Sequence, residues 1–281
     1  MPAARFEPYC WPVKPFHRAH PVRAYLNDPR ISGGSRAFHF GIDVSVPDGT
    51  PVYAVEAGTV HLEGGRSLSV LTASGRDFGY WHVVPAVTHL ERVAQYQLLG
   101  HVEAPWAHVH FAERRRGLYR NPLRAGALTP WTDSTSPRIA GIHLSRRGRE
   151  LSPDRVIGPV DVIVEAYDVP PLKVPAPWTN VPVTPALLRW RVRRGTIVVR
   201  PWHAPVDFRR TMLGRTLFPT IYAPGTRQNH PNEPGVYRFY LAHTWSTETL
   251  PDGRYHLDVQ AADVSGNKAT ATLPVTLANE L

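Results

Sequence analysis

The chain has 281 residues, among them 29 prolines, 21 glycines and a single cysteine, and it carries a net charge of +9. This length favours two domains, the many prolines and glycines favour strands and turns over long helices, and one cysteine excludes an internal disulfide. The basic excess weakly favours an anionic partner, and a basic face that is merely solvated is the alternative. No nucleic-acid-binding motif occurs in the sequence, so we expect no nucleic-acid partner.

The N-terminal residues 1–36 are rich in proline, arginine and aromatic side chains. We expect them to form an extended lead-in that lies across a sheet. They contain no apolar run of the length of a secretion signal, and no segment of about 20 apolar residues occurs anywhere. The sequence therefore predicts no membrane span and shows no export signal.

The next segment, residues 38–46, alternates apolar and polar side chains as a half-buried strand does. Its polar face carries His39 and Asp43, which a straight strand would hold about 13 Å apart. Both can bind one metal ion only if the chain bends between them, and Gly41 stands where the bend is needed. Two solvated side chains are the alternative. The apolar positions, which we expect to face the core, are Phe40, Ile42, Val44 and Val46.

Several strand-like runs follow, joined by turns. A turn at 47–50 precedes an alternating run at 51–62, and a glycine-bearing turn at 74–77 separates two further runs at 67–73 and 78–84. Residues 91–100 fit a short helix and a strand equally well.

A second pair of metal-competent side chains, His108 and His110, occurs two residues apart. On a strand the two imidazoles share one face, roughly 7 Å apart. Catalytic zinc needs three protein ligands and an open position, and His39, Asp43 and one of this pair supply such a set. The remaining histidine would then transfer protons. An isolated His-x-His on a surface strand is the alternative.

The second half begins after residues 130–137, which have the polar, proline-flanked composition of a linker. Beyond it, short strands separated by turns predict an antiparallel sandwich that resembles a bacterial immunoglobulin-like module. A long insert at 206–234 is predicted to be an extended loop, with a binding surface as the alternative. The predicted strands are 138–144, 160–167, 187–192, 196–200, 236–241, 254–262 and 268–277.

The first half resembles the lysostaphin-type, LytM-like zinc metallopeptidases that cut peptidoglycan peptides. The resemblance covers residues 11–123 and rests on five motifs in the family's order: His-Phe-Gly-Ile-Asp at 39–43, residues 49–54, Ala-Gly-Thr-Val at 57–60, Tyr-Trp-His at 80–82 and His-Val-His-Phe at 108–111. It implies a compact antiparallel sheet with a groove, a zinc ion (Zn²⁺) held by His39, Asp43 and His110, and His82 and His108 as catalytic histidines. The segment before His108 is poorer in glycine than in the family, and Ala112 stands where a glutamate is common.

These observations combine into one set of expectations. The chain is mainly β, with a lead-in at 1–36, a peptidase domain at 37–129, a linker at 130–137 and an immunoglobulin-like sandwich at 138–281. The resemblance implies a zinc endopeptidase of the cell envelope or the extracellular space. Its partners would be peptidoglycan peptides and, through the basic surface, anionic wall polymers. A catalytically silent wall-binding or regulatory scaffold is the alternative, and a zinc peptidase of another protein is a third.

Overall fold

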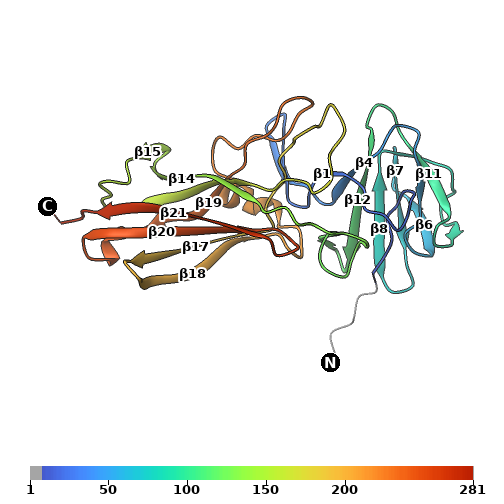
Figure 1. Ribbon diagram of the computed structural model, residues 1–281. Coiled ribbons are helices and arrows are strands. Elements are labelled where there is room, and N and C mark those ends of the chain that lie inside the picture. The colour runs from blue at the N-terminus through green and yellow to red at the C-terminus, as the bar shows by residue number, and fades with distance from the viewer. Residues whose placement is uncertain (1–7, 281) are drawn as a thin grey trace.

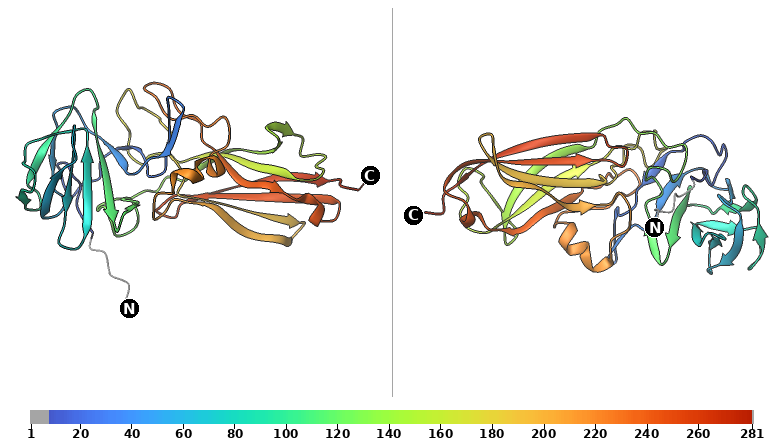
Figure 2. Two further views of the ribbon diagram at one scale, coloured as in Figure 1. Left: turned by 180° about the vertical axis from the view of Figure 1, so that it is seen from behind. Right: turned by 90° about the horizontal axis from the view of Figure 1, so that it is seen from below.

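The computed structural model describes residues 8–280, and its architecture is almost entirely antiparallel β (Figure 1). This confirms the predicted fold class. Two β units lie end to end in all the views of Figures 1 and 2. No helix among the described residues is long and apolar enough to cross a membrane.

The N-terminal unit is built on one large sheet of order β1-β4-β12-β8-β7-β6-β10, with β13 paired to β12. Its strands are β1 (Val22–Ala24), β4 (Ile42–Ser45), β6 (Gly58–Leu62), β7 (Ser67–Leu71), β8 (Arg76–Trp81), β10 (Arg92–Val93), β12 (His108–Arg115) and β13 (Leu118–Arg120). A smaller sheet of order β5-β11-β9 joins β5 (Pro51–Tyr53), β11 (Leu98–Val102) and β9 (Val83–Pro85). A hairpin pairs β2 (Pro29–Ser32) with β3 (Ser35–Phe38).

The pairing of β4 with β12 positions the candidate ligands. His110 lies opposite Asp43 and His108 opposite Ser45 in this antiparallel ladder. Their sequence neighbours Ile42 and Phe111 are fully buried in the core. The alternation along each strand therefore sends apolar side chains to one face and ligand-competent side chains to the other.

Two segments, each predicted to be one continuous strand, are divided into two strands in the structure. The run at 51–62 forms β5 and β6 in different sheets, because the chain leaves one sheet near Ala54 and enters the other at Gly58. The run at 78–84 is interrupted at His82, whose φ of 61° is incompatible with a strand. The ambiguous segment 91–100 is resolved as β10 and the start of β11.

The C-terminal unit is a pair of four-stranded sheets around a second core. One sheet, of order β15-β14-β16-β19, contains β14 (Arg138–Arg146), β15 (Arg149–Leu151), β16 (Val160–Tyr167) and β19 (Arg238–Trp245). The other, of order β18-β17-β20-β21, contains β17 (Leu187–Arg194), β18 (Ile197–Asp207), β20 (Gly253–Ala262) and β21 (Lys268–Leu277). Every predicted strand of this half has a counterpart here.

The predicted loop at 206–234 starts one residue before β18 ends, and it contains two short helices, η1 (Arg215–Leu217) and α1 (Phe218–Ile221). The only other helix among the described residues is η2 (Thr247–Thr249). The loops at 170–182 and 223–236 stand beside the β2–β3 hairpin above the junction of the two units in Figure 1.

The two units exchange side chains across their junction. Phe38 of β3 packs in the C-terminal core, and Val183 packs in the N-terminal core. Asn27 adds three hydrogen bonds: its side chain donates to the Thr211 carbonyl oxygen and accepts from the Leu213 amide, and its carbonyl oxygen accepts from the Tyr222 hydroxyl. Segment 130–137, which contains no strand, is therefore not the only connection between the units.

Candidate metal centre

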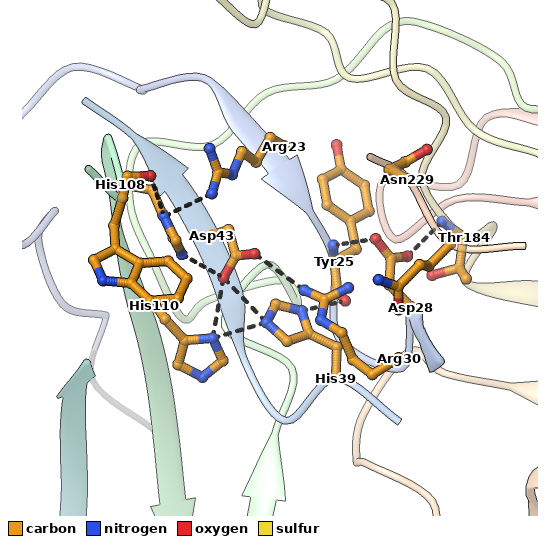
Figure 3. A network of polar contacts seen from close by, with 12 residues as sticks. Arg23, Tyr25, Asp28, Arg30, His39, Asp43, His108, His110, Thr184 and Asn229 are labelled. Carbon is orange, nitrogen blue, oxygen red and sulfur yellow. Dashed lines mark hydrogen bonds and ion pairs between the residues drawn. The ribbon is translucent and has the colours of Figure 1, made fainter. Parts of the chain in front are cut away.

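Three ligand-competent atoms converge on the polar face of the large sheet (Figure 3). His39 Nε2 lies 2.7 Å from His110 Nδ1 and 3.1 Å from Asp43 Oδ1, and the latter two atoms are 3.0 Å apart. All three residues are buried. The chain bends at Gly41, between β3 and β4, and this bend closes the distance between His39 and Asp43.

Neighbouring groups orient two of these ligands. His39 Nδ1 lies 2.9 Å from the Tyr25 carbonyl oxygen, which can only accept a hydrogen bond, so the proton sits on Nδ1 and Nε2 presents its lone pair. Arg30 donates to Asp43 Oδ2 at 3.0 Å, which leaves Oδ1 facing the imidazoles. Such outer contacts fix the geometry of metal ligands.

The donor set fits zinc. Two imidazole nitrogens and one carboxylate oxygen form one of the recurring kinds of catalytic zinc site, with a fourth position left open. Tetrahedral ligands at about 2.0–2.1 Å from zinc are about 3.3 Å apart, so these atoms need to separate by only a few tenths of an ångström. His110 Nε2 is buried without a hydrogen-bond partner and faces the Gly41 backbone, so only Nδ1 of this ring is aimed at the other two ligands.

The electrostatics keep the imidazoles neutral and the carboxylate charged. Burial lowers the pKa of His110 to about 4, and burial, followed by the charge of Arg30, lowers the pKa of His39. Burial would raise the pKa of Asp43, yet the surrounding histidines hold it well below its ordinary value. At neutral pH all three side chains are therefore in the protonation state that binds a metal.

His82 and His108 lie together beside this triangle. Their ring centroids are 4.6 Å apart, and the His82 ring stacks on Trp106 at 4.0 Å. His108 Nε2 is 3.5 Å from Asp43 Oδ1, and its Nδ1 lies within 2.8 Å of both the Trp106 carbonyl oxygen and the Arg23 guanidinium. The left-handed backbone of His82 costs a non-glycine residue free energy and is a feature of functional sites.

Phe40 does not face the core as predicted. It is only partly buried, and its ring packs 4.2 Å from the His110 ring and 4.9 Å from the Trp81 ring, measured between centroids. The strand period does not extend to residue 40, because β4 begins only at Ile42, after the bend. Phe40 therefore forms a wall beside the ligand His110.

Gly41 is required by close contact as well as by the bend. A β-carbon at this position would lie 2.4 Å from the Phe111 carbonyl oxygen and 2.9 Å from His110 Nε2. We expect Gly41→Val to destabilise the fold by about 1–3 kcal/mol, the usual range for overpacking, and to weaken zinc binding by displacing the His110 ring. Urea unfolding and zinc titration measure both effects. Gly214→Val is the matched control, because the nearest atom there is 4.0 Å away; equal behaviour of the two variants would contradict this explanation.

The metal-free protein should lose stability in acid. Burial lowers the pKa of His108 and His110 to about 4 in the folded chain, against about 6.5 in the unfolded chain. Between pH 6.5 and 4 the unfolded chain therefore binds more protons than the folded chain does. At pH 5 the free energy of unfolding is lower than at pH 7 by on the order of 2 kcal/mol per histidine. Denaturant unfolding at pH 7 and pH 5 measures this loss. It should shrink in the double variant His108→Gln/His110→Gln, and an unchanged pH dependence would show that these imidazoles titrate normally.

The site opens into a cavity of about 690 Å³ whose walls come from both units. The N-terminal unit contributes the ligands, both catalytic candidates, Arg23 and Arg30. The C-terminal unit contributes Pro177, Trp178, Gln228, Asn229 and Pro231, from the two loops beside the hairpin. The guanidinium of Arg23 lies 4.3 Å from the centroid of the Trp178 ring.

The structure thus places all five histidine and aspartate candidates in one cavity, with His39, Asp43 and His110 in mutual contact and His82 and His108 beside them. Sequence reasoning missed Arg23, Arg30 and Trp178. None of them belongs to a recurring motif, and each reaches the site through pairing or loop contacts that a local pattern does not reveal.

No protein-family model matches this chain, and no curated protein matches it. Among solved structures, a SpoIIIAH–SpoIIQ complex matches at 21% identity over 41% of this chain and 97% of that chain, with a TM-score of 0.37. A zinc-containing peptidase from Vibrio cholerae matches at 22% identity over 41% of this chain and 39% of that chain, with a TM-score of 0.35. The catalytic domain of lysostaphin, an antimicrobial peptidase from Staphylococcus simulans, matches at 24% identity over 32% of this chain and 74% of that chain, with a TM-score of 0.28.

Proposed function

We propose that this protein is a zinc-dependent endopeptidase that hydrolyses peptide bonds of peptidoglycan. The observation that carries the proposal is the convergence of His39 Nε2, Asp43 Oδ1 and His110 Nδ1 beside two further neutral histidines. Two imidazoles and a carboxylate would leave a bound Zn²⁺ with one net positive charge, which polarises a scissile carbonyl and lowers the pKa of an attacking water.

His82 and His108 would handle the protons. Burial lowers the pKa of each to about 4, so both are neutral at pH 7 and either can accept a proton. One of them would take the proton from the attacking water and, once protonated, pass it to the leaving amine, while the other would donate a hydrogen bond to the developing oxyanion. The contacts of His108 Nδ1 with Trp106 and Arg23 keep the Nε2 edge of this ring turned toward Asp43.

The cavity suits a peptide that carries carboxylates. Arg23 and Arg30 place two guanidinium groups on its wall, and Phe40, Trp81, Trp106 and Trp178 add apolar surface. Guanidinium groups bind carboxylates well, and the stem peptides of peptidoglycan carry carboxylates. These features support a wall peptide as the substrate, and we accordingly propose that the protein acts in the cell envelope or the extracellular space.

The C-terminal unit, which we propose to be an immunoglobulin-like module, would take part in substrate binding. We expect Trp178→Ala to raise the KM for peptidoglycan fragments by roughly tenfold while zinc content stays constant, because the loop wall is lost and the ligands are untouched. Steady-state kinetics on soluble fragments measure the KM. Trp202→Ala is the control, since Trp202 stacks on Arg189 and Arg191 and is not part of the cavity wall. Equal KM values for the two variants would show that Trp178 of the C-terminal unit does not take part in substrate binding.

Binding to anionic wall polymers through the basic surface is a further part of the proposal. The sequence has arginine clusters at 114–116 and 191–194, and several of these arginines are already paired: Arg114 with Asp77, and Arg191 and Arg193 with Asp258. Sedimentation of the full chain with purified walls at low and high salt tests the contribution of the remaining charge.

The proposal is tested by incubating purified, zinc-loaded protein with purified peptidoglycan and labelling new amino termini. Release of amino termini that stops on removal of zinc is the expected result.

A silent scaffold remains the second candidate, favoured by one observation. Arg30 neutralises Asp43 at 3.0 Å, and a cation so close to a ligand opposes binding of a metal cation. A folded, wall-binding protein without zinc would support this second function.

A further inference from the structure

A second cluster of possible metal ligands lies away from the zinc-type site, where the two units meet. Asp133 comes from the connecting segment, Asp168 follows β16 and Asp263 follows β20. One carboxylate oxygen of each lies within 4.8 Å of the others. Asp168 is 1% exposed and Asp263 2% exposed, while Asp133 is half-buried. The three carboxylates thus converge from three segments at a largely buried place.

Two of the three carboxylates leave an oxygen unsatisfied. Asp263 is held by its turn: its Oδ1 accepts hydrogen bonds from the Gly266 and Asn267 backbone amides at 2.6 and 2.9 Å, and its Oδ2 accepts one from the Asn267 side chain at 2.6 Å. Asp133 and Asp168 each use one oxygen, toward Thr135 and the Val169 amide. Their other oxygens, Oδ2 in both cases, are buried without a hydrogen-bond partner. Buried carboxylate oxygens are costly unless they are hydrogen-bonded or coordinate a metal.

A fourth, independent group points at the same place. The Tyr25 side chain is 6% exposed, and its hydroxyl is also buried without a hydrogen-bond partner. Burial raises the pKa of Tyr25, and among the charges that raise it further Asp168 and Asp133 act more strongly than Asp28, although Asp28 accepts a hydrogen bond from the Tyr25 backbone amide. Such effects weaken with distance, so this order is in keeping with a hydroxyl on the side of Asp168 and Asp133, while Asp263 contributes less than Asp28. Tyr25 and Asp168 also line one small cavity.

The charges around Asp168 make its ionised form still less favourable. Burial raises its pKa to about 8, and the charges that raise it further belong to Asp133, Asp263 and Asp28. Without a cation, Asp168 would therefore hold a proton at neutral pH, and a divalent ion would displace it.

We propose that Asp133, Asp168 and Asp263, with the Tyr25 hydroxyl beside them, bind one divalent cation of the Ca²⁺ type. The ligands are all oxygens, with no imidazole or thiol among them, which favours a hard cation. Ca²⁺ binds oxygens at 2.3–2.6 Å, so oxygens on opposite sides of the ion are about 4.6–5.2 Å apart, in keeping with the 4.8 Å limit of the cluster. A groove lined in part by Asp133 and Ser265 lies beside the cluster.

This ion would add a direct link between parts of the chain that already share packing and a few hydrogen bonds, such as that from the Asn267 side chain to the Asp133 carbonyl oxygen. Asp168 follows a strand of one sandwich sheet, Asp263 follows a strand of the other, and Asp133 lies in the connecting segment. Tyr25 belongs to the N-terminal unit, and its carbonyl oxygen accepts the hydrogen bond of His39 Nδ1. Figure 3 shows the Tyr25 ring extending away from His39.

The test is calcium titration of the full chain after removal of metals, followed by calorimetry and by thermal unfolding. We expect one Ca²⁺ per chain in the unaltered protein and a rise of Tm with Ca²⁺ concentration. Asp168→Asn should weaken binding by at least about tenfold and abolish the rise of Tm. The exposed Asp154→Asn is the matched control and should behave as the unaltered protein. His110→Ala should also keep calcium binding, which separates this site from the zinc-type site.

A second readout excludes simple misfolding. Without calcium, Asp168→Asn should have a Tm equal to or above that of the unaltered protein, because a neutral amide replaces a carboxyl that its neighbours repel. If Asp168→Asn fails to fold, Asp133→Asn, at a half-buried position, takes its place. The absence of calcium binding to the unaltered protein up to about 5 mM, beyond the weakest extracellular sites, would overturn the proposal. Full binding by the folded Asp168→Asn or Asp133→Asn protein would overturn it as well.

Discussion

His110→Ala should reduce the zinc content from about one ion per chain to nearly none and should abolish peptide hydrolysis. The substitution removes one of three converging ligand atoms, and His39 and Asp43 alone cannot hold the ion in a catalytic geometry. Metal catalysis contributes several kcal/mol to lowering the barrier, so we expect the rate to fall by at least about a thousandfold. Elemental analysis after gel filtration measures the zinc, and release of amino termini from peptidoglycan measures the rate.

The matched control for this variant is His101→Ala. His101 is an exposed imidazole of β11 in the same unit, and it is not part of the cavity wall. It should keep both zinc and activity. A His110→Ala protein that still carries one zinc per chain would mean that the ligands are not those we assign.

His108→Ala should separate catalysis from metal binding. His108 lies outside the triangle of the closest ligand atoms, with its Nε2 3.5 Å from Asp43 Oδ1, so zinc content should stay near one per chain. Loss of a group that transfers a proton in the transition state lowers rates by about 10²–10⁴-fold, and we expect a fall of that size. Elemental analysis and kcat measured on soluble wall fragments follow the two properties separately.

His82→Ala gives the companion measurement. Its ring lies beside His108 and stacks on Trp106 rather than contacting the ligands. It too should lose activity and keep zinc. Parallel loss of zinc in either variant would instead make that histidine a metal ligand, and unchanged rates would remove it from catalysis.

The C-terminal strands could be predicted from sequence because they are long and end at clear turn signals. In β16 and β21 the predicted and observed bounds coincide. Strand alternation depends only on neighbours along the chain, so a local pattern suffices. The same pattern failed at residues 51–62, where alternation continues although the chain passes from one sheet to another.

The candidate site divides in the same way. The ligand and catalytic positions lie in short motifs whose spacing is visible in the sequence. Arg23 and Arg30 carry no such signal, because they reach the site through the pairing of β1 with β4 and through the β2–β3 hairpin. The cavity wall at Trp178 and Asn229 depends on packing between the two units. These residues are so far from the ligands in the sequence that no local pattern could predict their contact with the site.

The most direct test of the proposed zinc-dependent peptidase activity is mass spectrometry of peptidoglycan after incubation with metal-free protein to which zinc is added stepwise. We predict soluble peptides with new amino termini whose amount rises with bound zinc and stops rising at one zinc per chain. A folded protein that holds one zinc per chain and yields no new peptide products would contradict the proposed activity.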